Sequence, residues 1–220
     1  MVKADLHIHT AYSMDCATSL DEIITRCVKL DINCLAITDH GTINGALKMK
    51  GLAPFTIIVS EEIVTPYGEV IGMFLTEKVP SGLSVEETIK LIKDQDGLVC
   101  IPHPCDRLRT SSFIDNNKLG EISPLIDIIE VFNARSLCPG SRARANKLAQ
   151  NLGKVSSAGS DAHTAAEIGS VYIEMPEFIN QSEFIKSLAQ GRICGHKSNP
   201  LVHLASTLNK FNRSSSPKEC

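Results

Sequence analysis

The chain has 220 residues and a formal net charge of -3, which suits one large globular domain with its own core. The slight acidic excess argues against a protein that holds nucleic acid through a broad basic surface. No apolar run approaches the roughly 20 residues that cross a bilayer, and the N-terminal residues lack the pattern of a signal peptide. We therefore expect a cytoplasmic protein that does not bind membranes and whose eight cysteines are mostly reduced.

Apolar segments of strand length alternate with amphipathic segments along most of the chain, as in repeated strand and helix units. The predicted strands are residues 2–7, 34–38, 56–64, 70–75, 98–101, 126–132, 155–158 and 171–174. The predicted helices are residues 19–30, 84–94, 142–151, 182–190 and 201–211. Ser19 and Ser84 begin two of these helices, and a glutamate three residues later completes a capping box in each.

The turn Pro66-Tyr67-Gly68 joins two apolar runs, so residues 56–75 are predicted to form a hairpin. Polar clusters follow nearly every predicted strand, as they do on the catalytic face of a barrel. We therefore predict an α/β fold, a distorted (β/α)7 TIM-like barrel in a single domain. This domain spans residues 1–211, and residues 212–220 form a polar tail.

Histidines and carboxylates gather at the ends of the predicted strands. His7 and His9 share one face of the first strand because alternate residues point the same way, and Asp5 on that face is predicted to orient one of the rings. Asp161 and His163 repeat this spacing after the strand at residues 155–158, and closure of the barrel would bring the two pairs together. The predicted metal ligands are His7, His9, Asp15, His40, Glu62, His103, Asp161 and His163.

Three of these positions keep an alternative interpretation. Asp15 is either a ligand or a simple turn residue. Asp39 precedes His40 at a strand end, where adjacent side chains diverge, so we predict that His40 binds metal and Asp39 supports it. Either Glu61 or Glu62 could bridge two ions, and we favour Glu62.

Mixed histidine and carboxylate ligands suit zinc, manganese or iron, and about eight of them are too many for one ion. Two or three divalent ions are therefore predicted, and paired ions favour hydrolysis because they acidify bound water. Arg107 and Arg109 follow His103, and Arg135 follows another strand end, where guanidinium groups would match phosphate oxygens. We predict that all three arginines bind substrate and that Arg107, Arg135 and Asp39 assist catalysis.

In this order, these residues resemble the polymerase and histidinol phosphatase (PHP) family of metal-dependent phosphoesterases. The resemblance rests on Asp5-Leu6-His7-Ile8-His9-Thr10, Thr38-Asp39-His40-Gly41, Glu62, Pro102-His103-Pro104, Asn133 and Gly159-Ser160-Asp161-Ala162-His163. It implies a barrel of seven strand and helix units with up to three ions at its C-terminal mouth. It also adds Asn133 to the substrate-binding residues.

The resemblance further implies how the ligands are shared between ions. One ion would be held by His7, His9, Glu62 and Asp161, a second by Glu62 and His103, and a third by Asp15, His40 and His163. Family members commonly carry a histidine on the strand after the bridging glutamate, whereas residues 69–75 contain none. The second ion is therefore expected to lack one ligand.

The predicted function is hydrolysis of phosphate esters, in which a metal-activated hydroxide attacks phosphorus while the ions and arginines stabilise the developing charge. The expected substrate is a small phosphomonoester, a nucleotide or the end of a short oligonucleotide. Two alternatives stay open. One is an amidohydrolase that cleaves C–N bonds, and the other is a metal-binding regulatory domain without activity.

Overall fold

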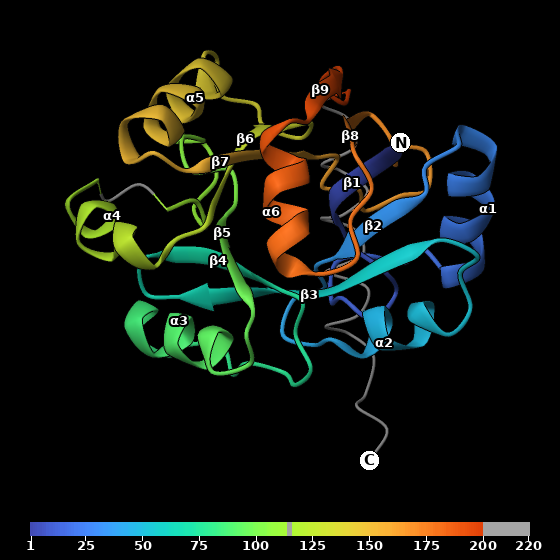
Figure 1. Ribbon diagram of the computed structural model, residues 1–220, viewed down its shortest axis with the longest axis horizontal. Coiled ribbons are helices and arrows are strands. Elements are labelled where there is room, and N and C mark those ends of the chain that lie inside the picture. The colour runs from blue at the N-terminus through green and yellow to red at the C-terminus, as the bar shows by residue number, and fades with distance from the viewer. Residues whose placement is uncertain (114–115, 200–220) are drawn as a thin grey trace.

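A curved sheet forms the centre of the computed structural model, which describes residues 1–113 and 116–199 (Figure 1). Its strands are β1 (Val2–Ile8), β2 (Cys34–Ile37), β3 (Thr56–Thr65), β4 (Gly68–Met73), β5 (Leu98–Ile101), β6 (Ile128–Asn133), β7 (Val155–Gly159), β8 (Val171–Met175) and β9 (Arg192–Gly195). The helices are α1 (Leu20–Leu30), α2 (Asn44–Lys50), α3 (Val85–Lys93), α4 (Asn116–Ile122), α5 (Ser141–Leu152) and α6 (Gln181–Ala189), with a 3-10 turn at Ser123–Leu125. Figure 1 shows α1 to α5 around the periphery and α6 across the strands.

The first and seventh strands meet and nearly close the sheet into a barrel. The strand order is β7-β6-β5-β4-β3-β2-β1-β8-β9, and the end of β1 also bonds to the residues after β7. Asp161 N–H donates to the carbonyl of His7 (2.7 Å), and His9 N–H donates to the carbonyl of Ala162 (2.9 Å). Gly159 permits this approach, because a Cβ there would lie 2.5 Å from the Cβ of His7. The predicted α/β barrel is confirmed, and its closure joins the two ends of the motif-bearing sequence.

The predicted hairpin is formed by β3 and β4, which pair antiparallel from Ser60–Met73 to Thr65–Gly68. β4 also runs antiparallel to β5, whereas β1, β2 and β3 are parallel to one another and β5, β6 and β7 likewise. The beginning of β4, rather than its end, therefore lies at the mouth where the parallel strands end. No helix separates β3 from β4, which is one way in which the barrel is distorted.

A bulge in β1 changes which side chains share a face. Asp5 pairs with Leu35 and Ile8 with Ile37, so three steps along β1 match two steps along β2. The carboxylate of Asp5 accepts hydrogen bonds from the backbone of Ser160 (2.8 Å) and Gly169 (3.1 Å). The prediction that Asp5 orients a histidine ring is therefore wrong, because the extra residue turns Asp5 and His7 to opposite faces.

Alternate residues of the strands belong to two buried cores. Leu35 and Ile37 lie in the core that packs against α1, α2 and α3. Cys34 and Ala36 lie in a second core with residues of β1, β3, β4, β5, β6 and α6. The four cysteines at positions 16, 27, 34 and 100 are buried free thiols, as expected for reduced core residues.

Both predicted capping boxes are present, at Ser19 with Glu22 and at Ser84 with Glu87. Three short elements were not predicted: α2 and α4, of seven residues each, and β9, of four. The two helices are too short for an apolar periodicity to mark them, and β9 has only two apolar residues, whereas the equally short β2 and β5 are apolar throughout. The predicted helix at residues 201–211 and the tail at 212–220 lie outside the described residues. No helix among the described residues has the length and apolar character needed to cross a membrane.

Candidate metal centre

The barrel mouth gathers all eight predicted metal ligands. His7 lies near the end of β1, Glu62 lies within β3, and the others lie in the segments that follow β1, β2, β5 and β7. Their side chains form overlapping groups of potential metal ligands: His9 with Asp15, His40 and His163; His7 with Glu62 and His103; and His7 with His9 and Asp161. All are buried except His40, which is partly exposed.

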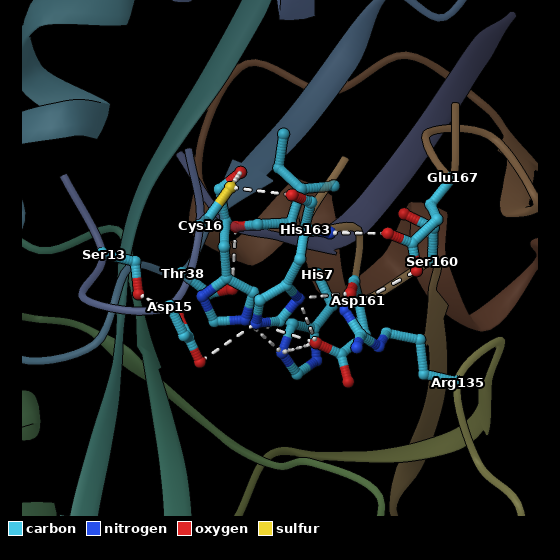
Figure 2. A network of polar contacts seen from close by, with 12 residues as sticks. His7, Ser13, Asp15, Cys16, Thr38, Arg135, Ser160, Asp161, His163 and Glu167 are labelled. Carbon is cyan, nitrogen blue, oxygen red and sulfur yellow. Dashed lines mark hydrogen bonds and ion pairs between the residues drawn. The ribbon is translucent and has the colours of Figure 1, made fainter. Parts of the chain in front are cut away.

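One group, formed by His7, His9 and Asp161, joins the two ends of the motif-bearing sequence. His7 and His9 bring their Nε2 atoms to 3.3 Å from each other. Oδ1 of Asp161 lies 3.3 Å from Nε2 of His9 and 3.6 Å from that of His7. Asp161 adopts a left-handed backbone conformation (φ 54°), which aspartate tolerates better than most residues. Figure 2 shows His7 and Asp161 converging on this point.

A second group surrounds Asp15, whose Oδ2 lies 3.1 Å from Nε2 of His163 and 3.4 Å from Nε2 of His40. The hydroxyl of Ser13 donates to the other carboxylate oxygen (2.8 Å), which holds Asp15 in this orientation (Figure 2). The Cys16 thiol contacts the carbonyls of His9 (3.4 Å) and His163 (3.2 Å). These bonds fix the loop after β1 against the loop after β7.

Glu62 occupies the middle of the centre. Its carboxylate lies 3.0 Å from Nε2 of His103, 3.3 Å from that of His7 and 3.4 Å from that of His9. The neighbouring Glu61 points elsewhere, because its carboxylate accepts a hydrogen bond from the backbone of Val79 (2.8 Å). Of the two candidates for the bridging position, the geometry places only Glu62 among the histidines.

Sequence reasoning missed Glu69, the second residue of β4. Its carboxylate is buried, with Oε2 3.6 Å from Nε2 of His103 and Oε1 3.8 Å from Nδ1 of His40. His40, Glu62 and Glu69 form a further group of potential ligands. The predicted ligands follow apolar runs, whereas Glu69 precedes one, because β4 runs antiparallel and brings its first residues to the mouth. β4 has no histidine, but Glu69 supplies a potential metal-ligand atom on this side of the centre.

A second missed residue, Glu130 of β6, supports the centre from behind. It approaches Nδ1 of His7 (3.1 Å), accepts the backbone N–H of His103 (2.8 Å) and accepts the side chain of Asn133 (3.1 Å). Glu130 thus performs the orienting role that was predicted for Asp5. The sequence does carry a signal for Glu130, because it is a carboxylate within an apolar strand and a buried charge requires polar partners nearby.

Asp39 lies behind the histidines and does not point among them. Its carboxylate accepts hydrogen bonds from the backbone (2.6 Å) and hydroxyl (2.7 Å) of Thr10, the residue after His9. The first turn of α2 packs on this pair, since a Cβ at Gly45 would lie 2.2 Å from Oδ2 of Asp39. This position agrees with a supporting role and gives Asp39 no contact with a substrate at the mouth.

The electrostatics of the centre reflect buried carboxylates facing imidazoles. Burial disfavours the charge on Glu62, but His7 and His40 outweigh it and hold its pKa well below the ordinary value. Burial likewise disfavours a charge on His7, yet Glu62 and Asp161 hold its pKa well above the ordinary value. Burial and the nearby His9 lower the pKa of His163 to about 4, so this ring is neutral at pH 7.

The donor set fits divalent cations. Oδ1 of Asp161 and Nδ1 of His40 are buried without a hydrogen-bond partner, although both lie among acceptors and imidazole nitrogens. The Nε2 atoms of His7 and His9 lie only 3.3 Å apart, and both face the acceptor oxygens of Glu62 and Asp161, so these four side chains direct their polar atoms into one shared space. Cations among these atoms would satisfy all of them, and mixed nitrogen and oxygen ligands suit zinc, manganese or iron.

Two family models match the chain. The PHP domain matches residues 5–72, and the PHP-associated family matches residues 139–193. The chain belongs to the PHP family. It is 39% identical over 146 residues to Uncharacterized protein MJ1587 of Methanocaldococcus jannaschii, covering 60% of this chain and 82% of that protein. Uncharacterized protein MJ0417 of the same organism is 33% identical over 197 residues, covering 85% of this chain and 79% of that protein.

Two solved structures share the PHP fold of this chain. One is a two-domain protein of Bacteroides vulgatus that contains a predicted PHP-like metal-dependent phosphoesterase. It has a TM-score of 0.70 at 14% identity and covers 94% of this chain and 69% of its own. The other is an amidohydrolase of Chromobacterium violaceum with bound sulfate and no metal, with a TM-score of 0.63 at 15% identity over 87% of this chain and 97% of its own. At these identities the likeness concerns the fold alone.

Two of the three predicted arginines of this PHP chain lie near the metal centre, and the third lies away from it. Arg109 lies at the mouth, where Nη2 donates to Oδ2 of Asp161 (2.6 Å), and Asn133 contacts the same oxygen (3.2 Å). Arg135 is buried beside Glu167 (3.6 Å), behind Asp161 (Figure 2). Arg107 is exposed and lines a cavity on the outer side of the barrel, so the structure does not bring it to the metal centre.

Proposed function

We propose that this PHP-family chain is a metal-dependent hydrolase of phosphate esters. The observation that supports it most is the single buried cluster at the barrel mouth, in which five histidines and four carboxylates face one another beside the guanidinium of Arg109. Nine such donors exceed what one ion can take up. A small phosphomonoester, a nucleotide or the end of a short oligonucleotide is the proposed substrate.

The proposed ions share their ligands across the centre. His7, His9, Asp161 and Glu62 would hold one ion, and Asp15, His40 and His163 a second. Glu62 and His103 would hold the remaining ion, and we assign Glu69 to it as the ligand that the sequence pattern did not supply. Glu69 replaces a neutral nitrogen with a charged oxygen, which favours the harder cations manganese and iron over zinc at this position.

The ions, when bound, would activate water and neutralise the charge of the phosphate group. The side chains of the protein would do the rest. Arg109 binds Asp161 through one N–H and retains further donors for phosphate oxygens at the mouth. Asn133 donates to the same carboxylate, so it would orient Asp161 beside the substrate. Arg135 and Asp39 would act as positioning residues, because both are buried, Arg135 forms an ion pair with Glu167, and Asp39 accepts a hydrogen bond from Thr10.

A panel of phosphomonoesters and phosphodiesters, assayed with manganese, iron and zinc, tests the proposal. We expect turnover with at least one ester, and a loss of about a thousandfold or more in Glu62→Gln, which changes one oxygen of the central carboxylate. His196→Ala is the matched control for His9→Ala, because His196 is exposed after β9. His9→Ala should lose activity to a similar extent, whereas His196→Ala should keep it. Metal-loaded protein that hydrolyses no ester, or equal activity in His9→Ala and His196→Ala, would contradict the proposal.

Hydrolysis of a C–N bond is the second candidate, since an amidohydrolase shares the fold. Arg109 distinguishes the two functions. A phosphate ester requires its positive charge, so Arg109→Gln should lower kcat/KM by about a hundredfold or more. An amide substrate is neutral, so in metal-saturated protein the same substitution should then leave KM unchanged and lower kcat only through the lost contact with Asp161, whereas a phosphate ester should also show a raised KM.

A further inference from the structure

A cavity of about 380 Å³ lies on the outer side of the barrel, between α5 and the loop that follows β5. Figure 1 shows α5 at the periphery, beside β6. The cavity is lined by Pro104, Cys105, Arg107, Arg144, Lys147, Leu148, Asn151 and Leu152. None of these residues belongs to the groups of metal ligands, and the volume falls within the range of small-molecule sites.

The lining carries three positive charges and no carboxylate. Arg107 and Lys147 have no ion pair with any described residue, and Arg144 bonds only to uncharged atoms. Lys118 shows the contrasting case of an exposed region where cation and carboxylates occur together, because it pairs with Glu86 and Glu121. In a chain whose net charge is -3, such a concentration of positive charge favours an anionic ligand.

Arg144 is held in place although it is exposed. Nη1 donates to the carbonyl of Pro139 (3.0 Å), while Nη2 donates to the carbonyl of Cys105 (3.2 Å) and to Sγ of Cys138 (3.0 Å). A guanidinium group has five N–H donors, so two of them remain for a ligand. Because the Arg144 side chain is already fixed, it loses less conformational entropy when an anion binds.

The cavity also has an apolar part, which is formed by Pro104, Leu148 and Leu152. Arg144, Lys147, Leu148 and Asn151 recur at helical spacing, so one face of α5 presents both cations and apolar groups. A ligand that matches this surface has an anionic head and a compact apolar body.

We propose that this cavity is a second binding site for a small organic phosphate, separate from the metal centre. Arg144 and Lys147 bind the phosphate oxygens from α5, Arg107 approaches them from the loop, and the apolar residues contact the body of the ligand. The loop from His103 to Arg109 lines this cavity and also reaches the metal centre, so the two sites are neighbours along the chain.

Protection of Cys105 from alkylation tests the proposal. Phenylphosphonate is a suitable probe, because its C–P bond resists phosphoesterases and it combines a phosphate-like group with an aromatic ring. With metal-loaded protein we expect the probe to slow alkylation of Cys105 by iodoacetamide, as followed by peptide mass spectrometry. Alkylation of Cys194, a half-buried thiol on β9, should keep its rate.

Variants distinguish this site from the metal centre. Arg144→Ala combined with Lys147→Ala should raise the probe concentration needed for half-protection by about tenfold or more, and Lys147→Arg should retain protection. Lys186→Ala, which removes an exposed charge from α6, is the matched control. If the double variant fails to fold, Lys147→Ala alone replaces it in the test, because alanine is well tolerated in a helix. Unchanged Cys105 reactivity with the probe, or full protection in the variants without these charges, would overturn the proposal whatever esters the enzyme hydrolyses.

Discussion

Replacement of Gly159 by alanine tests the closure of the barrel. The new Cβ would lie 2.5 Å from the Cβ of His7 and 2.6 Å from its backbone nitrogen. An ordinary contact begins near 3.4 Å, so β7 and β1 must separate by about 0.9 Å, the difference between 3.4 and 2.5 Å. Neither atom belongs to the end of a flexible side chain, and the backbone itself must therefore move.

Overpacking of this kind costs about 1–3 kcal/mol of the free energy of unfolding, which corresponds to a decrease in Tm of about 2–12 °C for a chain of this size. The same movement separates His7 from Asp161, whose ligand atoms now lie 3.6 Å apart. Because metal sites tolerate displacements of only about 0.5 Å, we expect metal affinity to fall about tenfold or more.

Urea denaturation of the metal-free protein and a metal titration measure these two effects. Gly120→Ala is the matched control, because a Cβ at Gly120 on α4 would meet nothing within 4 Å. Alanine favours the helix there, so its stability should stay the same or rise by up to about 1 kcal/mol. A Gly159→Ala protein that unfolds at the wild-type urea concentration and binds metal with wild-type affinity would refute the account of closure.

Three further predictions concern the support, the charge and the scaffold of the centre. Glu130→Gln should weaken metal binding by about 10–100-fold in a metal titration because it disturbs the support of His7, whereas the exposed Glu121→Gln should not. Burial opposes a charge on His9, but Asp161 and Glu62 outweigh it and raise the pKa of His9 to about 10 in the metal-free protein. A metal requires the neutral ring, so affinity should rise with pH from 7 to 10, and calorimetry in buffers of different ionisation enthalpy should detect proton release; a pH-independent affinity without release would contradict this. Ser84→Ala should lower the free energy of unfolding by about 1 kcal/mol in urea denaturation through loss of the capping box, and an unchanged midpoint would show that the cap contributes nothing.

The sequence predicts the barrel well because its strands are short apolar runs with polar residues at their ends. The capping boxes at Ser19 and Ser84 are local signals, and they specify helix starts without knowledge of the tertiary fold. The pairing of the first motif with the last also follows from the pattern, since closure of a barrel brings the first and last of its strands together. Short elements such as α2 and β9 carry no comparable signal.

The errors in the predicted site have two physical causes. A bulge in β1 changes the alternation of side chains, so Asp5 faces away from the ring that it was expected to orient, and no residue type marks that bulge. The antiparallel direction of β4 places its first residues at the mouth, so a search of strand ends finds no donor and misses Glu69. Arg107 is predicted to belong to the site because it lies four residues after His103, but its side chain lines the outer cavity, so closeness in sequence does not predict its position.

Metal stoichiometry, measured together with ester hydrolysis, tests the central claim most directly. Protein saturated with manganese, iron or zinc and freed of unbound metal should contain two or three ions per chain by elemental analysis. Turnover of a phosphate ester should rise with occupancy and disappear on chelation. Fewer than two ions per chain at saturation, or ester hydrolysis that persists without metal, would contradict the account.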